Sequence, residues 1–460
     1  MKRLLLSTIG VFLIVAGGRL AEAQVTAIKA SYVIDGVQGD AIEDGVVLVQ
    51  GDEILSVGPS SEVQIPPGAV IVELIGHTLL PGLIDSHDHP TLRADSLSLQ
   101  PMIDQRMDPG GNQMVRAVRN MRISLLSGTT TVRVTGESSG IDFQLGKAIQ
   151  SGMIPGPRII ASGMPIVATS PGAGPLWPTD GVDEIRKRIR ENVFGGAQFT
   201  KMYLSDTSPT TSILSKEEAC AAVDESHRLG IPITSHVVGK WGASIRLALE
   251  CGVDSFEHVR PINDEMIKLF VQHESHLNIT PLIFIAGGID WSKELWRRLD
   301  NEMSSIEEWN DFNRATIREA RMSNPAGEIA DRPQDVFEHP GAQDVDFTPG
   351  IKPYQENLLK AHRQGVSISH GTDSLHGTLL LNIEFLVEGG FTPMEAIHAT
   401  TRVAAEGLGS GWASRIGTLE PGKLADIISV EGNPLTNIKD LAKVSFIMIG
   451  GRRFDPLSFH

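Results

Sequence analysis

The middle of the chain alternates between two hydrophobic patterns. Short apolar runs rich in Val, Ile and Thr are followed by longer stretches whose apolar residues recur at helical spacing, from residue 80 to residue 412. This alternation is typical of βα units around a parallel sheet. We interpret eight runs as strands, at residues 83–86, 130–134, 158–161, 199–202, 233–235, 255–257, 277–279 and 367–369. Eight such strands close a TIM barrel, so we predict an α/β fold with a (β/α)8 barrel over 80–412.

The two ends of the chain carry a different pattern, in which short β-like runs are divided by Gly, Pro and Asp turn signals. Near the N-terminus the runs lie at residues 25–33, 45–49, 54–57 and 70–74, and near the C-terminus at 425–430 and 444–449. The first set predicts a small antiparallel sheet. We expect residues 24–79 and 413–460 to form one composite β-sandwich domain.

A segment after the seventh predicted strand is longer than a crossover requires. Residues 287–350 are rich in charge and carry Trp291, Trp296 and Trp309. An excursion of this length is either a lid over the active face or an exposed insertion, and we favour the lid.

The first 23 residues have the organisation of a secretory signal peptide. Lys2 and Arg3 precede the apolar residues 4–18, and Ala21-Glu22-Ala23 forms a small-x-small pattern before Gln24. The apolar run is short for a membrane span, and Gln24 is not a lipid-accepting Cys, which disfavours an uncleaved anchor or a lipoprotein. We therefore expect an exported protein, periplasmic or secreted, with no stable membrane insertion after signal removal.

The formal net charge of −16 disfavours nucleic acid and anionic membranes as partners, because both reward clustered Lys and Arg. We expect a small-molecule substrate, and the oligomeric state stays open, with a homo-oligomer as one alternative. Cys220 and Cys251 are the only cysteines, each within or beside a predicted amphipathic helix. We expect both to be small core residues, with a disulfide between them as the alternative.

Candidate metal ligands follow several of the predicted strands. His87 and His89 come after the first strand at spacing i, i+2, so both side chains can address one metal. Alone, a His-x-His pair is weak evidence, since it also occurs on surfaces and in cores. Four more candidates, however, lie at the carboxyl ends of later strands: Lys201, His236, His258 and Asp373. These ends meet at one mouth of a barrel, and imidazole and carboxylate ligands without Cys indicate a catalytic metal site.

With these residues in place, the chain resembles the amidohydrolase superfamily. Residues 81–89, Pro-Gly-Leu-Ile-Asp-Ser-His-Asp-His, are similar to its first-strand motif, and residues 417–426 are similar to its return into the β-domain. Residues 127–133, 252–258 and 371–377 resemble the imidazolonepropionase-like group, which includes Xaa-Pro dipeptidases. The chain departs from relatives at 235–239, Ser-His-Val-Val-Gly, which leaves the substrate open.

The resemblance implies a binuclear centre bridged by a lysine that has reacted with carbon dioxide, and Lys201 stands at that position. His87, His89, Lys201 and Asp373 would hold one divalent metal, and Lys201, His236 and His258 the other. The metals would be Zn, with Mn, Fe or Co as alternatives.

Two such cations would activate a water molecule as hydroxide and polarise the scissile carbonyl. Asp373 would take the proton and return it to the leaving nitrogen. Tyr203 lies two residues beyond Lys201 and either hydrogen-bonds the carbonyl oxygen or packs at the barrel mouth, and His376 is a candidate for substrate contact.

We predict a hydrolase of amide-like C–N bonds, acting on a dipeptide or an N-acyl compound. A phosphoester, lactone or carbamate is the first alternative, because the same chemistry attacks each of them. A non-catalytic metal or solute carrier is the second, although a binding protein has no need of Asp373 as a proton shuttle.

Overall fold

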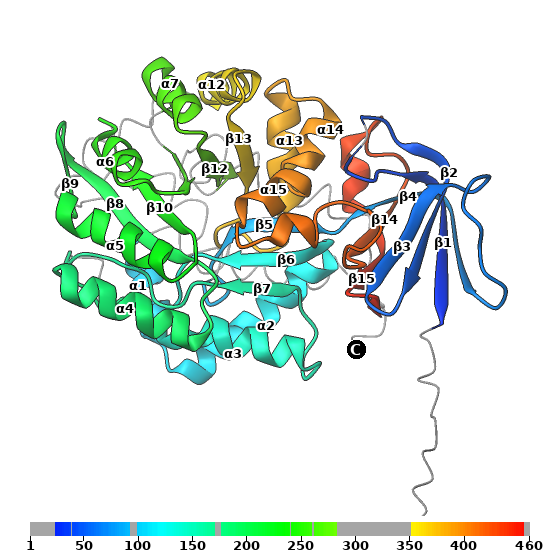
Figure 1. Cartoon of the computed structure of the whole chain (residues 1–460), viewed down its shortest axis with the longest axis horizontal. Coiled ribbons are helices and arrows are strands. Elements are labelled where there is room, and N and C mark those ends of the chain that lie inside the picture. The colour runs from blue at the N-terminus through cyan, green and yellow to red at the C-terminus, as the bar shows by residue number, and fades with distance from the viewer. Residues whose placement is uncertain are drawn as a thin grey trace, which may run out of the picture.

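A computed structural model describes residues 24–37, 39–92, 99–170, 176–239, 241–259, 262–282 and 351–454. Two units lie side by side, a β-domain made from both ends of the chain and a barrel made from its middle (Figure 1). The predicted fold class is therefore confirmed. The predicted signal peptide at 1–23 and the whole predicted lid at 287–350 lie outside the described residues, so neither prediction is tested.

The β-domain contains a seven-stranded sheet in the order β16-β15-β14-β4-β1-β2-β3. Its strands are β1 Val25–Val33, β2 Ile42–Gln50, β3 Glu53–Pro59, β4 Val70–Pro81, β14 Ile427–Glu431, β15 Val444–Ile449 and β16 Arg452–Phe454. The two chain ends join where β14 pairs antiparallel with β4. The expectation of a purely antiparallel N-terminal sheet is wrong, because β1 and β4 pair in parallel. A parallel pair needs a crossover, which β2 and β3 supply.

All eight predicted barrel strands are present, and they run in parallel. They are β5 Leu83–Asp88, β6 Thr129–Val134, β7 Arg158–Ala161, β8 Thr200–Ser208, β10 Ile233–Val238, β11 Ser255–Glu257, β12 His276–Ile279 and β13 Ser367–His370. The short strand β9 Thr211–Ser212 folds back on β8. These strands are rich in β-branched and apolar residues that the barrel interior and its helices bury, which is why the sequence pattern marks them.

Two backbone contacts close the ring. Between β7 and β8, the amide of Ile166 donates to the carbonyl of Lys201 at 2.8 Å. Between β13 and β5, the amide of Asp373 donates to the carbonyl of His87, and the amide of His89 donates to the carbonyl of Asp373, both at 2.7 Å. Four predicted site residues, His87, His89, Lys201 and Asp373, thus take part in closing the barrel.

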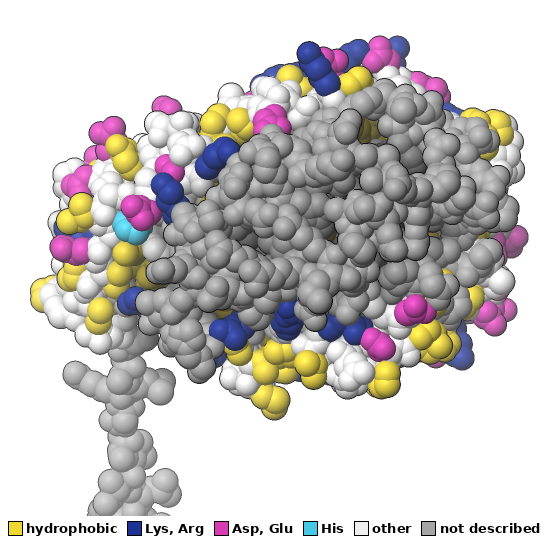
Figure 2. Space-filling model, turned by 180° about the vertical axis from the view of Figure 1, so that it is seen from behind, with side chains coloured by type: hydrophobic (Ala, Val, Ile, Leu, Met, Phe, Trp, Pro, Cys, Tyr) yellow, Lys and Arg dark blue, Asp and Glu magenta, His cyan; other side chains and the backbone are white. Residues whose placement is uncertain are grey.

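Helices surround the strands in the order that βα units require (Figure 1). They are α1 Leu99–Met107, α2 Gly110–Leu126, α3 Ile141–Gln150, α4 Val182–Gly195, α5 Lys216–Arg228, α6 Ala243–Cys251, α7 Asp264–Gln272, α12 Ile351–Arg363, α13 Leu379–Glu388, α14 Pro393–His398 and α15 Arg402–Gly407. No helix in the described part of the chain is long and apolar enough to cross a membrane. On the face drawn in Figure 2, acidic and basic side chains of the described residues are interspersed.

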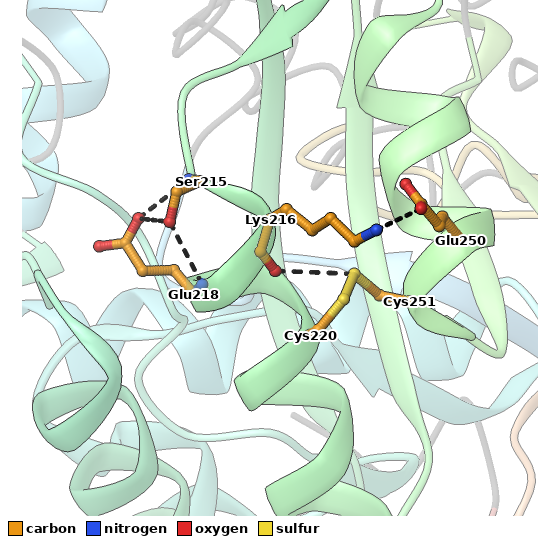
Figure 3. The surroundings of a disulfide bond; sticks show 6 residues. All are labelled: Ser215, Lys216, Glu218, Cys220, Glu250 and Cys251. Atoms are coloured by element: carbon orange, nitrogen blue, oxygen red, sulfur yellow. Dashed lines mark hydrogen bonds and ion pairs between the residues drawn. A yellow bond between two sulfur atoms is a disulfide. The ribbon is translucent and has the colours of Figure 1, made fainter.

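Cys220 and Cys251 form a disulfide that joins α5 to α6 (Figure 3). The expectation of two free core cysteines is therefore wrong. The helical periodicity predicted each helix, but not that the two helices pack side by side. They are consecutive in the barrel, and the Cα atoms of Cys220 and Cys251 lie 4.7 Å apart. Beside the disulfide, Lys216 forms an ion pair with Glu250, which also connects the two helices.

Candidate active site

The carboxyl ends of five strands bring the predicted site residues to one mouth of the barrel. His87 lies on β5 and His89 directly follows it. Lys201 and Tyr203 lie on β8 and His236 on β10, while His258 follows β11 and Asp373 follows β13. Most of these side chains are buried, and His236, Tyr203 and Asp373 are partly exposed.

Asp373 lies at the centre of the cluster. Its carboxylate oxygens are 3.9 Å from His87 Nε2, 3.8 Å from His89 Nε2 and 4.0 Å from His258 Nδ1. One ligand atom each from His87, His258 and Asp373 can be chosen so that all lie within 4.8 Å of one another. The described residues therefore contain a candidate site for a divalent metal, built from the residue types that such metals favour.

The remaining rings extend this cluster. The ring centroids of His87 and His258 are 4.5 Å apart, as are those of His258 and His236. Tyr203 stacks on His236 at 5.0 Å, and Lys201 Nζ lies 5.0 Å from the Tyr203 ring. All the predicted metal-site residues therefore converge.

Hydrogen bonds fix which ring nitrogens face the cluster. His87 Nδ1 donates to the Glu257 carboxylate at 2.6 Å, and His89 Nδ1 donates to the carbonyl of Gly136 at 3.0 Å. An acceptor on Nδ1 leaves the lone pair on Nε2, which is the arrangement of a metal-binding histidine. In both residues Nε2 is the nitrogen that faces Asp373.

Three buried polar atoms test whether a metal fits. His87 Nε2, Lys201 Nζ and His236 Nδ1 have no hydrogen-bond partner among the residues that the structure describes. A buried polar atom without a partner is costly, unless a ligand satisfies it. Because these atoms belong to three predicted metal ligands, the donor set fits a divalent metal.

Burial shifts the protonation equilibria of the site, and for the basic ligands the shift is in the direction that metal binding requires. It lowers the pKa of His89, His236 and His258 well below the usual value, so the imidazoles are neutral. It also lowers the pKa of Lys201 to about 8, which makes the neutral amine accessible near physiological pH. Burial raises the pKa of Asp373.

The backbone is unusual at two of the ligands. His258 has φ of 70° and Asp373 has φ of 62°, in the left-handed region that residues with a side chain rarely adopt. Such conformations persist where the surrounding structure enforces them, and they cluster at functional sites. Each turns the chain sharply just after its strand, so that both side chains meet at the mouth.

Residues 78–454 match the sequence model of a protein family, which is described as the amidohydrolase family. The chain belongs to the amidohydrolase family. This membership and the candidate metal site confirm the predicted class of enzyme, a metal-dependent hydrolase of C–N bonds.

Two relatives illustrate how far the similarity extends. An ochratoxinase from Aspergillus niger is 27% identical to this amidohydrolase over 477 residues, covering 94% of this chain and 87% of the relative. A crystal structure of a Xaa-Pro dipeptidase with bound methionine superimposes with a TM-score of 0.70 at 24% identity, covering 94% of this chain and all of the other. The crystal structure of the A. niger ochratoxinase gives a TM-score of 0.69 at 24% identity, with 95% and 97% of the two chains covered. The structural comparisons support the fold alone.

Two functional residues of this amidohydrolase escaped the sequence reasoning. Glu257 and Arg133 are almost completely buried and form an ion pair at 2.7 Å. Burial alone would raise the pKa of Glu257, but Arg133 and His87 hold it well below its usual range. The sequence did contain a signal for these two residues, because each is a charged residue inside a short apolar strand. Glu257 orients His87, and Arg133 keeps Glu257 ionised.

His376 lies beside the mouth but is engaged at both ring nitrogens. Nδ1 is 3.1 Å from the Asp88 carboxylate and Nε2 is 2.8 Å from the carbonyl of Leu92. Burial alone would lower its pKa, but Asp88 raises it, so both nitrogens donate. His376 therefore fastens the loop after β13 to the loop after β5, and its contact with substrate stays a prediction.

Proposed function

We propose that the protein cleaves an amide-like C–N bond of a dipeptide or N-acyl compound at a binuclear metal centre. The proposal is carried by one observation: buried nitrogens of His87, Lys201 and His236, which have no hydrogen-bond partner in the described part of the chain, converge with the Asp373 carboxylate. A site of this composition is costly to fold without metal, and its six candidate ligands exceed the four that a single tetrahedral cation uses.

His87, His89, Lys201 and Asp373 would hold one metal, and Lys201, His236 and His258 the other. We propose an N6-carboxylated Lys201 as the bridge and zinc as the metal, with Mn, Fe or Co as alternatives. Carboxylation is supported by the burial of Lys201, because carbon dioxide reacts with the neutral amine and desolvation favours that form. Nitrogen and oxygen ligands suit all four metals.

When bound, the metals supply Lewis acidity that activates water and polarises the substrate carbonyl. The side chains supply the rest. Asp373, whose pKa is raised by burial, takes the proton of the attacking water and returns it to the leaving nitrogen. Tyr203 remains protonated, because burial raises its pKa to about 12, and its hydroxyl can donate to the carbonyl oxygen as negative charge develops. Glu257 keeps His87 in the required tautomer and orientation.

The names of the relatives favour an amide-like substrate over a phosphoester, lactone or carbamate. One is an ochratoxinase and one a Xaa-Pro dipeptidase, and a dipeptidase acts on a peptide bond by definition. We extend this chemistry, but neither substrate, to the present chain.

We further propose that the protein is exported, to a periplasm or outside the cell, and acts on a small molecule. The N-terminal signal pattern and the Cys220–Cys251 disulfide support the location, because disulfides persist mainly in oxidising compartments. The interspersed charges in Figure 2 support a partner other than a polyanion on that face.

A turnover screen with metal analysis tests the proposed function. Purified protein is assayed on dipeptides, N-acyl amino acids, lactones, carbamates and phosphoesters while its metals are quantified. We expect turnover of amides, with two metals per chain, and parallel loss of metal and activity in His87→Ala and His236→Ala. Full metal occupancy with normal turnover in both variants would overturn the site, and turnover confined to the other bonds would overturn the substrate class.

A further inference from the structure

Arg106 is a buried cation for which the described residues provide no ion pair. It lies in the last turn of α1, its side chain is almost completely buried, and its Nε and Nη1 have no hydrogen-bond partner among the residues that the structure describes. Neither the metal site nor the proposed chemistry uses it. An isolated guanidinium cannot lower the cost of burial by losing its proton, because its pKa is too high.

The end of α1 is fastened to the barrel mouth on the side of His89. Arg116, on α2, donates from Nη2 to the carbonyl of Gln105 at 2.8 Å and from Nε to the carbonyl of Thr91 at 2.6 Å. Gln113 donates to the carbonyl of Arg106 at 3.0 Å. Since Thr91 is only two residues beyond His89, these bonds fix Arg106 at the rim of the metal site.

The acidic residue at this rim is already engaged. Glu137 accepts hydrogen bonds from the amide and hydroxyl of Thr91, at 3.2 and 2.6 Å. Arg106 is the first charge that lowers the pKa of Glu137, and it acts on His89 as well, but no ion pair joins Arg106 to Glu137. Arg106 also opposes the rise in the pKa of Tyr203. The positive charge of the Arg106 guanidinium therefore lies close to Glu137, His89 and Tyr203.

Arg133 provides the comparison within the same barrel. It is buried as deeply as Arg106, but Glu257 neutralises it at 2.7 Å. Breaking a pair of this kind is strongly destabilising, since a buried charge is left without compensation. The lack of an ion pair between Arg106 and any described residue is thus the arrangement expected of a site whose anion comes with the ligand.

We propose that Arg106 binds a carboxylate of the substrate. The substrates would then be anionic amides, such as N-acyl amino acids or dipeptides with a free carboxylate, held with the scissile bond at the metal site. A guanidinium fork matches a carboxylate through paired charged hydrogen bonds, and in a buried setting it discriminates strongly against a neutral analogue. This inference rests on the proposed function for its choice of amide substrates, but the burial of Arg106 and its two unbonded nitrogens do not depend on that function.

The test uses matched probes that differ only in charge. A set of N-acetyl amino acids and their carboxamides is presented to the metal-loaded wild type, Arg106→Gln and Arg106→Lys, and both calorimetric binding and turnover are measured. Arg453→Gln, an exposed arginine on β16, is the control for a charge change elsewhere. We expect the wild type to prefer the carboxylates by about 10²-fold or more in Kd or kcat/KM. Arg106→Gln should abolish most of this preference, Arg106→Lys should restore part of it, and Arg453→Gln should retain it.

The readouts separate the two proposals. Turnover without a carboxylate preference overturns the role of Arg106 and leaves the amide hydrolase intact. An Arg106-dependent preference in binding without turnover of any amide does the reverse. A preference that persists in Arg106→Gln, or the failure of wild type to bind either member of every pair at millimolar concentration, also overturns the role of Arg106. Circular dichroism and metal content, measured on each variant, exclude misfolding as the cause of a lost preference.

Discussion

Glu257→Gln should affect both the stability of the barrel and its affinity for metal. Four donors converge on the Glu257 carboxylate: His87 Nδ1 at 2.6 Å, Arg133 Nη1 at 2.7 Å, Thr234 Oγ1 at 2.5 Å and Asn278 Nδ2 at 3.1 Å. A carboxylate can accept all four bonds, whereas an amide presents one oxygen and one donating NH2 group. The substitution keeps the shape of the side chain and removes its charge.

The main cost comes from Arg133. Its guanidinium is buried and packs at 4.2 Å from the centre of the Phe199 ring, so water cannot replace the lost carboxylate. Removing one partner of a buried ion pair costs about 3–5 kcal/mol. Because His87 also loses the acceptor on Nδ1, we expect metal affinity to fall by about 10–100-fold. Guanidinium unfolding of the metal-free protein measures the first effect, and metal titration measures the second.

Glu225→Gln is the matched control. Glu225 is also buried and ion-paired, with Arg186, Arg190 and Arg228 on the surface of α4 and α5. These arginines are partly exposed, and water can solvate them once the carboxylate is gone. We expect a loss of about 1–2 kcal/mol in total and no change in metal affinity. If Glu257→Gln destabilises the protein no more than Glu225→Gln and retains full metal affinity, the orienting role of Glu257 is wrong.

Three further outcomes are expected. Asp373→Asn cannot take up the proton of water, so turnover should fall by roughly 10²-fold or more, and near-normal kcat would exclude Asp373 as the shuttle. Lys201→Ala should lose metal and activity, and an added small carboxylic acid should restore both in part, to a degree that depends on the size of the acid. Native mass spectrometry of the wild type should detect one carbon dioxide adduct. The absence of both the rescue and the adduct would refute carboxylation. Cys220 and Cys251 are 31 residues apart, so reduction of their disulfide should lower the free energy of unfolding by about 3–4 kcal/mol. An unchanged unfolding midpoint in reductant would show that α5 and α6 need no covalent link.

The sequence predicted the barrel well because its strands are distinguished by local composition. Residues 158–161 and 255–257 were assigned with the bounds that the structure has, since each is a short apolar run between turn signals and amphipathic stretches. The metal ligands followed from the same pattern, because the carboxyl ends of barrel strands share one mouth. The pairing of β1 with β4 was beyond this reasoning, since hydrophobic alternation does not specify whether a neighbour runs parallel or antiparallel.

What the sequence could not supply were contacts between side chains far apart in the chain. Arg133 and Glu257 are charged residues in apolar strands, and only the closed ring brings them to 2.7 Å. Cys220 and Cys251 each fit an amphipathic helix, and their pairing depends on how the two helices lie against each other. Arg106 is a comparable case, because an arginine near the end of a helix is ordinarily solvated and only the structure shows it buried.

The contact between β13 and β5 is the seam where the barrel closes, so the metal site is complete only when the whole barrel has folded. The bonds of Asp373 to the backbones of His87 and His89 join the first and last strands of the barrel, which are the most distant in sequence. Contacts of this kind carry the largest loop-closure entropy and slow the approach to the native state. No partial barrel that lacks the last strand can assemble the ligand set. A metal that binds only the closed ring would in turn stabilise the contact between β13 and β5 against local opening, so metal loading would act as the final step of maturation.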